Sequence, residues 1–119
     1  SSRTKLFLRI LEAELKDLIE DIKLVERRQK ESYERLKITQ YVFKENTALL
    51  EQELECLHAL LKRIFALKAS EYANCGELAD AVIAEARAFV DKNGYPESVV
   101  AFVERKVGKV KRYCSEPDE

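Results

Sequence analysis

The chain has 119 residues, 46% of them hydrophobic and 36% charged, with a net charge of −1. This length suits one domain, and the apolar fraction is large enough for a core, so the composition argues against a disordered chain. The near-neutral charge gives no overall attraction to nucleic acid or anionic membrane, and no apolar run reaches the ~18 residues of a spanning helix. All glycines and prolines lie at or beyond residue 76, which favours long helices before that point.

Cysteine and methionine usage bear on the location and origin of the chain. Cys56, Cys75 and Cys114 form an odd set without CxxC spacing, so we expect reduced thiols and a cytoplasmic protein rather than a disulfide framework. Methionine is absent, including an initiator, which indicates a processed chain or a fragment. We expect residues 1–119 to form a single all-helical domain that ends in an acidic tail at 113–119.

Apolar residues recur with heptad spacing over the first half of the chain. Eight of the nine a positions are apolar, in the order Leu8, Leu15, Ile22, Gln29, Leu36, Phe43, Leu50, Leu57 and Ile64. The d positions are apolar at both ends but polar in the middle, where they are Ser32, Thr39, Asn46 and Glu53. The predicted seam is therefore apolar at both the a and d positions near its two ends. Between about residues 29 and 53 its d positions are polar, so that part of the seam is apolar on one side only.

Two architectures fit this pattern. In the first, a long antiparallel hairpin (about 4–44 and 47–73) reverses near 44–47, with Asn46 or Thr47 as the cap of the second helix. In the second, one continuous helix of about 70 residues forms a coiled-coil dimer. We favour the hairpin, because a dimer would bury the polar d positions at roughly 1–3 kcal/mol for each unsatisfied group.

The second half of the chain predicts a shorter helix pair, giving an all-α helical bundle. Gly76 suits the end of the preceding helix, and Asn93-Gly94 followed by Pro96 suits a boundary between helices at about 77–92 and 96–112. Apolar residues at helical spacing predict the inward faces of this pair, namely Leu78, Val82, Ala86, Phe89 and Val90, then Val99, Val103, Val107 and Val110.

No motif indicates catalysis or a cofactor. Glu55-x-x-His58 has the spacing of a di-iron ligand pair, but that site needs two histidines and the chain has one. Cys56 and His58 are two residues apart on a helix and point in nearly opposite directions, so they cannot share a zinc ion. We therefore expect neither an enzyme nor a metal or cofactor site.

Two surfaces are candidates for partner binding. Several apolar residues fall outside the regular seam and, if exposed, would form a partner site: Phe7, Ile10, Ile38, Tyr41 and Val42. The last predicted helix carries a basic patch of Arg105, Lys106, Lys109, Lys111 and Arg112.

The favoured function is a non-catalytic protein-protein interaction domain, an adaptor, assembly factor or scaffold that binds another protein or itself through helices. One alternative is a small cytoplasmic helical chaperone of the export type, which would shield an amphipathic client segment. The other is a weak binder of nucleic acid or an acidic partner through the basic patch.

Overall fold

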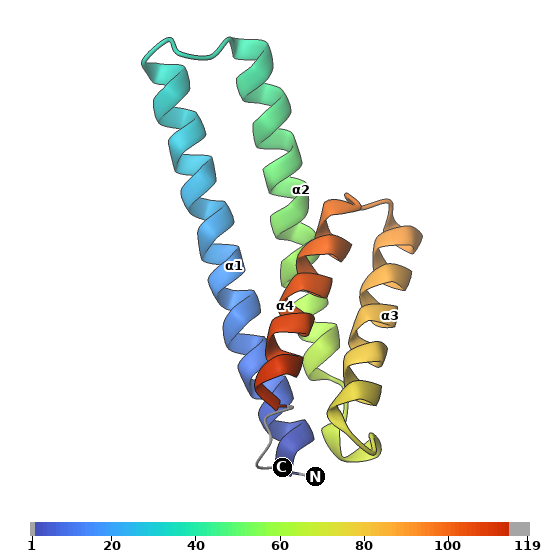
Figure 1. The fold of residues 1–119 in the computed structure, drawn as a ribbon. Helices are drawn as coiled ribbons and strands as arrows, with labels where there is room; N and C mark the ends of the chain where they lie inside the picture. The colour runs from blue at the N-terminus through green and yellow to red at the C-terminus, as the bar shows by residue number, and fades with distance from the viewer. Residues whose placement is uncertain (1, 115–119) are drawn as a thin grey trace.

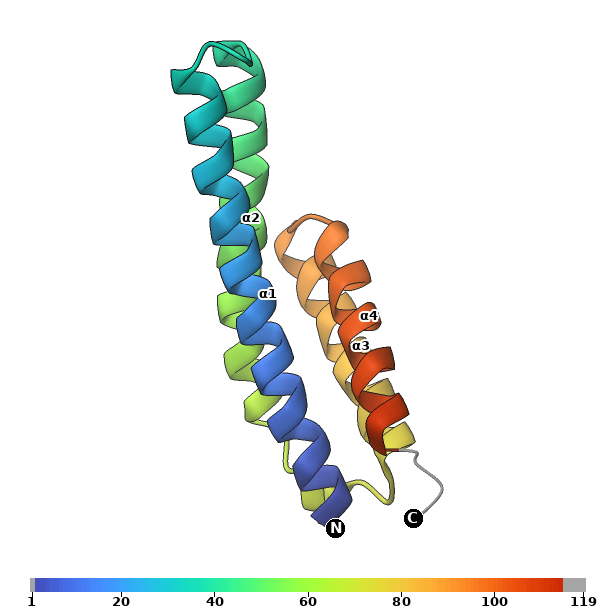
Figure 2. The ribbon, with the colours of Figure 1, turned by 60° about the vertical axis from the view of Figure 1, so that its left-hand side comes forward.

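Four α-helices form two antiparallel hairpins (Figure 1). The structure, a computed structural model, describes residues 2–114. The elements are α1 (Ser2–Glu34), α2 (Gln40–Phe65), a 3-10 turn η1 (Ala69–Glu71), α3 (Cys75–Asn93) and α4 (Ser98–Cys114), and no strand occurs among the described residues. The shorter α3–α4 hairpin packs against one face of the longer α1–α2 hairpin (Figure 2). The predicted all-α bundle with a long and a short hairpin is confirmed.

The turn of the long hairpin lies at residues 35–39, before the predicted reversal at 44–47. Helix α1 ends in a Schellman motif, in which the N–H of Lys37 donates to the carbonyl of Ser32 and the N–H of Leu36 donates to that of Tyr33. Leu36 occupies the left-handed position of this motif with φ 60°. Glycine is the usual residue there, and its absence is why the sequence did not indicate a turn at this point.

Thr39, rather than Asn46 or Thr47, caps the second helix. Its hydroxyl oxygen accepts a hydrogen bond from the backbone N–H of Val42 at 3.1 Å, which satisfies one of the open donors of the first turn. Asn46 instead lies in the second turn of α2 and donates its side-chain amide to Gln29 of α1 at 2.8 Å. The continuous helix is not found, because the chain reverses between Glu34 and Gln40.

The link between the two hairpins also differs from its prediction. Helix α2 ends at Phe65, not near residue 73, and Gly76 lies inside the first turn of α3 rather than at the end of α2. Asn74 caps α3 by accepting a hydrogen bond from the N–H of Glu77 at 2.9 Å, while the Glu77 carboxylate accepts one from the N–H of Ala73 at 3.1 Å. This reciprocal pair of side-chain hydrogen bonds starts the helix before the glycine.

The short hairpin matches its prediction more closely. Gly94 ends α3 in the left-handed conformation with φ 68°. Pro96 precedes α4, which begins two residues later than predicted, at Ser98. The predicted inward residues are buried, apart from the half-buried Phe89: Leu78, Val82, Ala86, Val90, Val99, Val103, Val107 and Val110.

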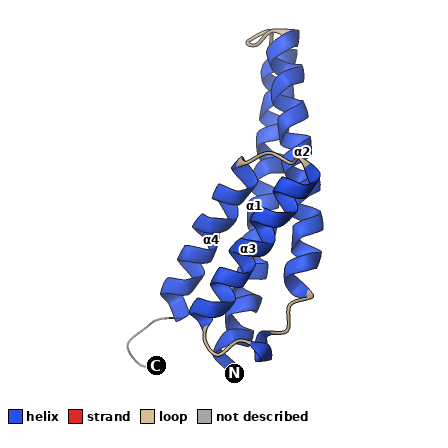
Figure 3. Ribbon diagram, turned by 90° about the vertical axis from the view of Figure 1, so that its right-hand side faces the viewer, coloured by secondary structure: helices blue, strands red, loops and turns tan. Residues whose placement is uncertain are grey.

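The hydrophobic core lies where the two hairpins overlap. Among residues 2–114, every buried residue belongs either to 4–22 or to 53–114. Beyond that overlap the long hairpin continues as a projecting arm, defined here as residues 23–52 (Figures 1 and 3). The Cα radius of gyration is 16.6 Å, larger than the ~13.5 Å expected for a compact domain of this length. The arm accounts for the elongated shape.

Candidate functional site

The arm is a pair of helices held together by a thin, partly polar seam. None of residues 23–52 is fully buried. The hydrogen bond between Asn46 and Gln29 crosses the seam, and nearer the turn the rings of Tyr33 and Phe43 stack with centroids 4.5 Å apart and an interplanar angle of 5°. These contacts hold α1 and α2 together without enclosing a core.

Exposed hydrophobic residues concentrate on the arm. Of eight large hydrophobic side chains that are exposed among the described residues, six lie within residues 23–52: Leu24, Val25, Leu36, Tyr41, Val42 and Leu49. A soluble monomer exposes single hydrophobic residues routinely, but a concentration of them in one segment indicates a contact surface.

Val25 extends the face of α1 that the short hairpin covers. Glu14 marks that face, because its carboxylate binds Lys106 and Lys109 of α4 at 3.1 and 2.9 Å. Val25 follows Glu14 by eleven residues, close to three full turns, so both side chains leave the helix in nearly the same direction. The Val25 side chain is 40% exposed, so the short hairpin does not cover it.

Helix α2 repeats this arrangement. Glu53 is buried and accepts a hydrogen bond from the hydroxyl of Ser98, the first residue of α4, at 2.5 Å. Leu49 and Val42 precede Glu53 by four and eleven residues and therefore lie on the same side of α2. They are 47% and 39% exposed. Val25, Val42 and Leu49 together form what we call the distal patch, which continues the covered face beyond the end of the short hairpin.

The tip of the arm presents further apolar groups. Leu36 is 89% exposed and Tyr41 is 73% exposed, while Ile38 between them is half-buried. A leucine with positive φ is strained, and strain in an exposed loop is more common at functional positions than elsewhere.

Two of the five predicted partner-binding residues do not lie on the surface as expected. Phe7 is completely buried in the core, and Ile10 is half-buried against it, because α1 packs against both α2 and α4 and therefore buries a face wider than a heptad seam. The other three, Ile38, Tyr41 and Val42, lie on the arm. The sequence analysis did not propose Val25, Leu36 or Leu49 as partner-binding residues, and it assigned Leu36 to the regular a positions of the heptad seam.

The predicted basic patch on α4 is divided. Lys106 and Lys109 point back to α1 and bind Glu14, which lowers the pKa of the Glu14 carboxyl, mainly through the hydrogen bond from Lys109. The same contact raises the pKa of Lys109. Arg105 lies over the ring of Phe102, 5.7 Å from its centroid. Because two of its five cations hold the bundle together, the patch is not one open cationic surface.

A groove follows the face of the long hairpin opposite to the short hairpin. Its upper part, on the arm, has a volume of about 430 Å³ and is lined by Lys23, Glu26, Arg27, Lys30, Phe43 and Thr47. Its lower part has a volume of about 380 Å³ and is lined by Lys16, Ile19, Glu20, Lys23, His58 and Leu61. The two parts share Lys23, so they adjoin along the same side of the hairpin.

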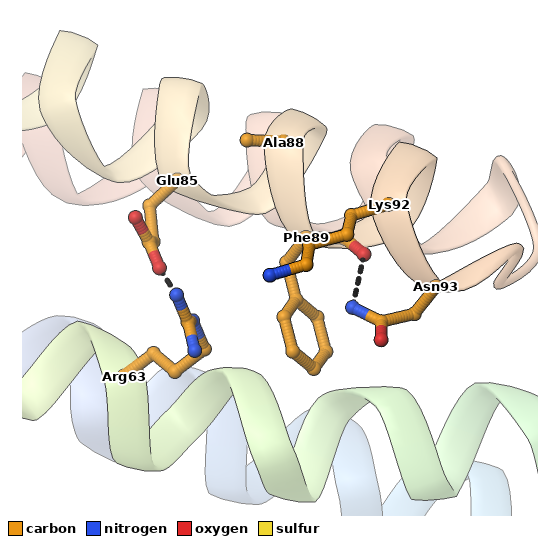
Figure 4. A pocket seen from close by; sticks show the side chains of 6 residues that line it. All are labelled: Arg63, Glu85, Ala88, Phe89, Lys92 and Asn93. Carbon is orange, nitrogen blue, oxygen red and sulfur yellow. Dashed lines mark hydrogen bonds and ion pairs between the residues drawn. The ribbon is translucent and has the colours of Figure 1, made fainter.

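A smaller pocket between α2 and α3 is occupied by its own side chains (Figure 4). Its volume is about 160 Å³. Arg63 of α2 forms an ion pair with Glu85 of α3 and lies 5.1 Å from the centroid of the Phe89 ring. The ion pair between Arg63 and Glu85 therefore links α2 to α3 across this pocket.

The cysteines and the histidine do not form a cluster. Within residues 2–114, no group of three or more His, Cys, Asp or Glu side chains is placed to hold a metal ion. Cys56 is fully buried, and burial raises the pKa of its thiol to about 11, which makes it a poor nucleophile. His58 lies exposed on α2 at the lower part of the groove.

None of the helices in residues 2–114 combines the length and apolarity needed to cross a membrane. No protein-family model matches this chain, and neither the curated proteins nor the solved structures contain a significantly similar one.

Proposed function

We propose that this protein is a non-catalytic interaction domain that holds a partner protein through its projecting arm. The observation that supports this function is the contrast between the two halves of the long hairpin. Residues 4–22 and 53–64 build a core against the short hairpin. Residues 23–52 bury no side chain fully and carry six of the eight large hydrophobic residues that are exposed within residues 2–114. An adaptor or scaffold role follows from a rigid base that displays such an arm.

The distal patch is large enough to contribute to binding. Val25, Val42 and Leu49 are each about half exposed, so burying the remaining surface of each contributes roughly 1 kcal/mol. Leu36 and Tyr41 add area at the tip, and aromatic side chains are enriched at such interfaces. Cys56 and Cys75 are thiols rather than halves of a disulfide, which supports a reducing, cytoplasmic setting for this interaction.

Site-specific photo-crosslinking in the protein's own cells tests the proposal. A photoreactive phenylalanine analogue replaces Tyr41 or Leu49 on the arm, and in a control it replaces Tyr113, which is 55% exposed at the end of α4. We expect one discrete adduct from the arm positions and none from the control. Absence of an adduct at both arm positions, or equal adducts from the control, would refute the proposal.

Charge substitutions on the distal patch provide the second arm of this test. The double substitution Val42→Lys and Leu49→Lys should remove the adduct formed from Tyr41 while leaving the helical circular dichroism unchanged. The matched control is Leu6→Lys, at a residue that is 46% exposed but outside the arm. Light scattering distinguishes a different protein from a second copy of this chain as the partner.

A further inference from the structure

The open side of the long hairpin carries a stripe of cations. Lys23 and Lys30 follow Lys16 at intervals of seven residues, and Lys23 follows Glu14 by nine, or two and a half turns. The three lysines therefore lie on the side of α1 opposite to Glu14, away from the short hairpin. Lys16 and Lys23 form ion pairs with Glu12 and Glu20 at 3.4 and 3.2 Å.

At the upper part of the groove the cations exceed the carboxylates. Lys23, Arg27 and Lys30 line it with Glu26 as the one acidic residue. Within residues 2–114, neither Arg27 nor Lys30 has a carboxylate partner at ion-pair distance. The groove thus offers two uncommitted cations to an anionic ligand.

The floor of the groove is apolar. In the upper part it includes Phe43, whose ring is fixed by stacking on Tyr33. In the lower part it includes Leu61, next to the buried core residue Ile19. From residue 16 to residue 30 the lining of α1 extends about 21 Å at 1.5 Å per residue, or four turns of helix. A groove between two antiparallel helices with this length and floor accommodates the apolar side of a third helix.

We propose that this groove binds an amphipathic, acidic helix of a partner protein, with apolar side chains on Phe43 and Leu61 and flanking carboxylates on Arg27 and Lys30. This proposal rests on the proposed function, because it treats the arm as a binding element. It places the binding site for the acidic helix on the side of the long hairpin opposite to the distal patch. The bound helix would complete a three-helix bundle along the arm. The uncommitted cations select for carboxylates, and the apolar floor selects against a ligand that carries charge alone.

An unbiased selection followed by charge substitutions tests this site. A display library of random 18-residue peptides is selected on the full chain, and the enriched peptides are synthesised and measured by fluorescence anisotropy. We expect enriched sequences with apolar residues at i, i+3, i+4 and i+7 and a surplus of Asp and Glu. Failure to enrich peptides, or enrichment of basic ones, overturns the proposal.

A pair of substitutions at one lining residue separates charge from steric effects. Thr47→Glu and Thr47→Lys introduce side chains of comparable length into the groove, and both suit a helix. We expect Thr47→Glu to weaken peptide binding about tenfold, because it adds a charge that repels the peptide, and Thr47→Lys to leave binding within about twofold or strengthen it. Equal effects of the two substitutions would show that charge does not select the ligand and would overturn the proposal.

The rim cations have their own matched control. The double substitution Arg27→Glu and Lys30→Glu should weaken binding by about tenfold or more, whereas Arg105→Glu with Arg112→Glu, the same charge change on α4, should not. Polyglutamate and a thymidine oligonucleotide serve as anions without apolar side chains. If either binds as tightly as the selected peptides with the same dependence on Arg27 and Lys30, the assignment to an amphipathic helix is refuted.

The two proposals fail in distinguishable ways. Val42→Lys with Leu49→Lys acts on the distal patch and should leave peptide binding in the groove unchanged. If the groove variants have no effect on peptide binding while the distal-patch variants abolish photo-crosslinking, the arm remains a binding element and only the groove assignment is lost. The opposite result would retain the groove and reject the distal patch.

Discussion

The hydrogen bond between Ser98 and Glu53 joins the two hairpins at the base of the arm. Glu53 is only 5% exposed, and the Ser98 hydroxyl donates to its carboxylate at 2.5 Å. The carboxylate also lies at the N-terminal end of α4, where the helix dipole favours negative charge. Replacing Ser98 with alanine removes the donor and leaves a buried carboxylate group unsatisfied, at a cost of about 1–3 kcal/mol in the free energy of unfolding.

The reverse substitution should behave differently. Glu53→Leu removes the group that needs a partner and puts an apolar side chain at a d position beside the core, so we expect it to be neutral or stabilising. In the Glu53→Leu background, Ser98→Ala should then cost close to nothing. A double-mutant cycle therefore isolates the hydrogen bond from the small change in helix propensity that Ser98→Ala also causes.

Urea unfolding followed by circular dichroism measures all four proteins of the cycle. A loss of 1 kcal/mol should also appear as a fall in Tm of about 3–6 °C for a chain of this size. The reasoning is refuted if Ser98→Ala costs less than about 0.3 kcal/mol, or if it costs the same amount with leucine at position 53. Either result would mean that Glu53 does not depend on this donor.

Three further predictions follow from other contacts. Leu36→Asn should raise the free energy of unfolding by about 0.5–1 kcal/mol, measured by urea unfolding, because asparagine tolerates the left-handed backbone better than leucine; an unchanged or lower value would contradict this. The pKa of Glu14 is held below its ordinary value of 4.5, so its contribution to stability is present above that pH and is lost as the pH falls through the lower folded value. Glu14→Gln should therefore make the free energy of unfolding less dependent on pH in the acid range. An unchanged pH dependence in that range would contradict this prediction. In a timed iodoacetamide reaction at pH 8, Cys75 should be modified well before Cys56, which is fully buried with its pKa raised to about 11; equal rates by mass spectrometry would argue against the described burial.

Helix ends marked by specific backbone chemistry were predictable, whereas the turn of the long hairpin was not. Gly94 ends α3 as predicted, because glycine followed by Pro96 is a strong stop signal. The turn at 35–39 has no glycine or proline and places Leu36 in a conformation that leucine rarely adopts. Thr39, which caps α2, entered the sequence analysis only as a polar d position of an unbroken heptad pattern, and the cap was predicted at Asn46 or Thr47 instead.

The heptad phase was misleading for a physical reason. Ile22 and Leu57 are both buried, and they are separated by thirty-five residues, a whole number of heptads. The two helices are antiparallel and have independent phases, so agreement across the turn carries no information about continuity. The heptad pattern also underestimated the buried face of α1, which packs against α4 as well as α2 and buries Phe7 outside the a and d positions.

The polar seam of the arm explains how one hairpin can present binding surfaces on both sides. A fully apolar seam over residues 22–53 would favour pairing with another such helix over reversal. Instead, the Asn46 amide donates a hydrogen bond to Gln29 within the chain, which favours one register of α1 against α2. The stacked rings of Tyr33 and Phe43 add a second contact between α1 and α2. Because these contacts hold the two helices together, the other apolar residues of the arm do not have to face the seam. Val25 and Leu49 are therefore free to lie on the side above the short hairpin, while the groove with its cations occupies the other side. Asn46 is one of the polar d positions that argued against a coiled-coil dimer, and its hydrogen bond to Gln29 helps the arm to project from the core.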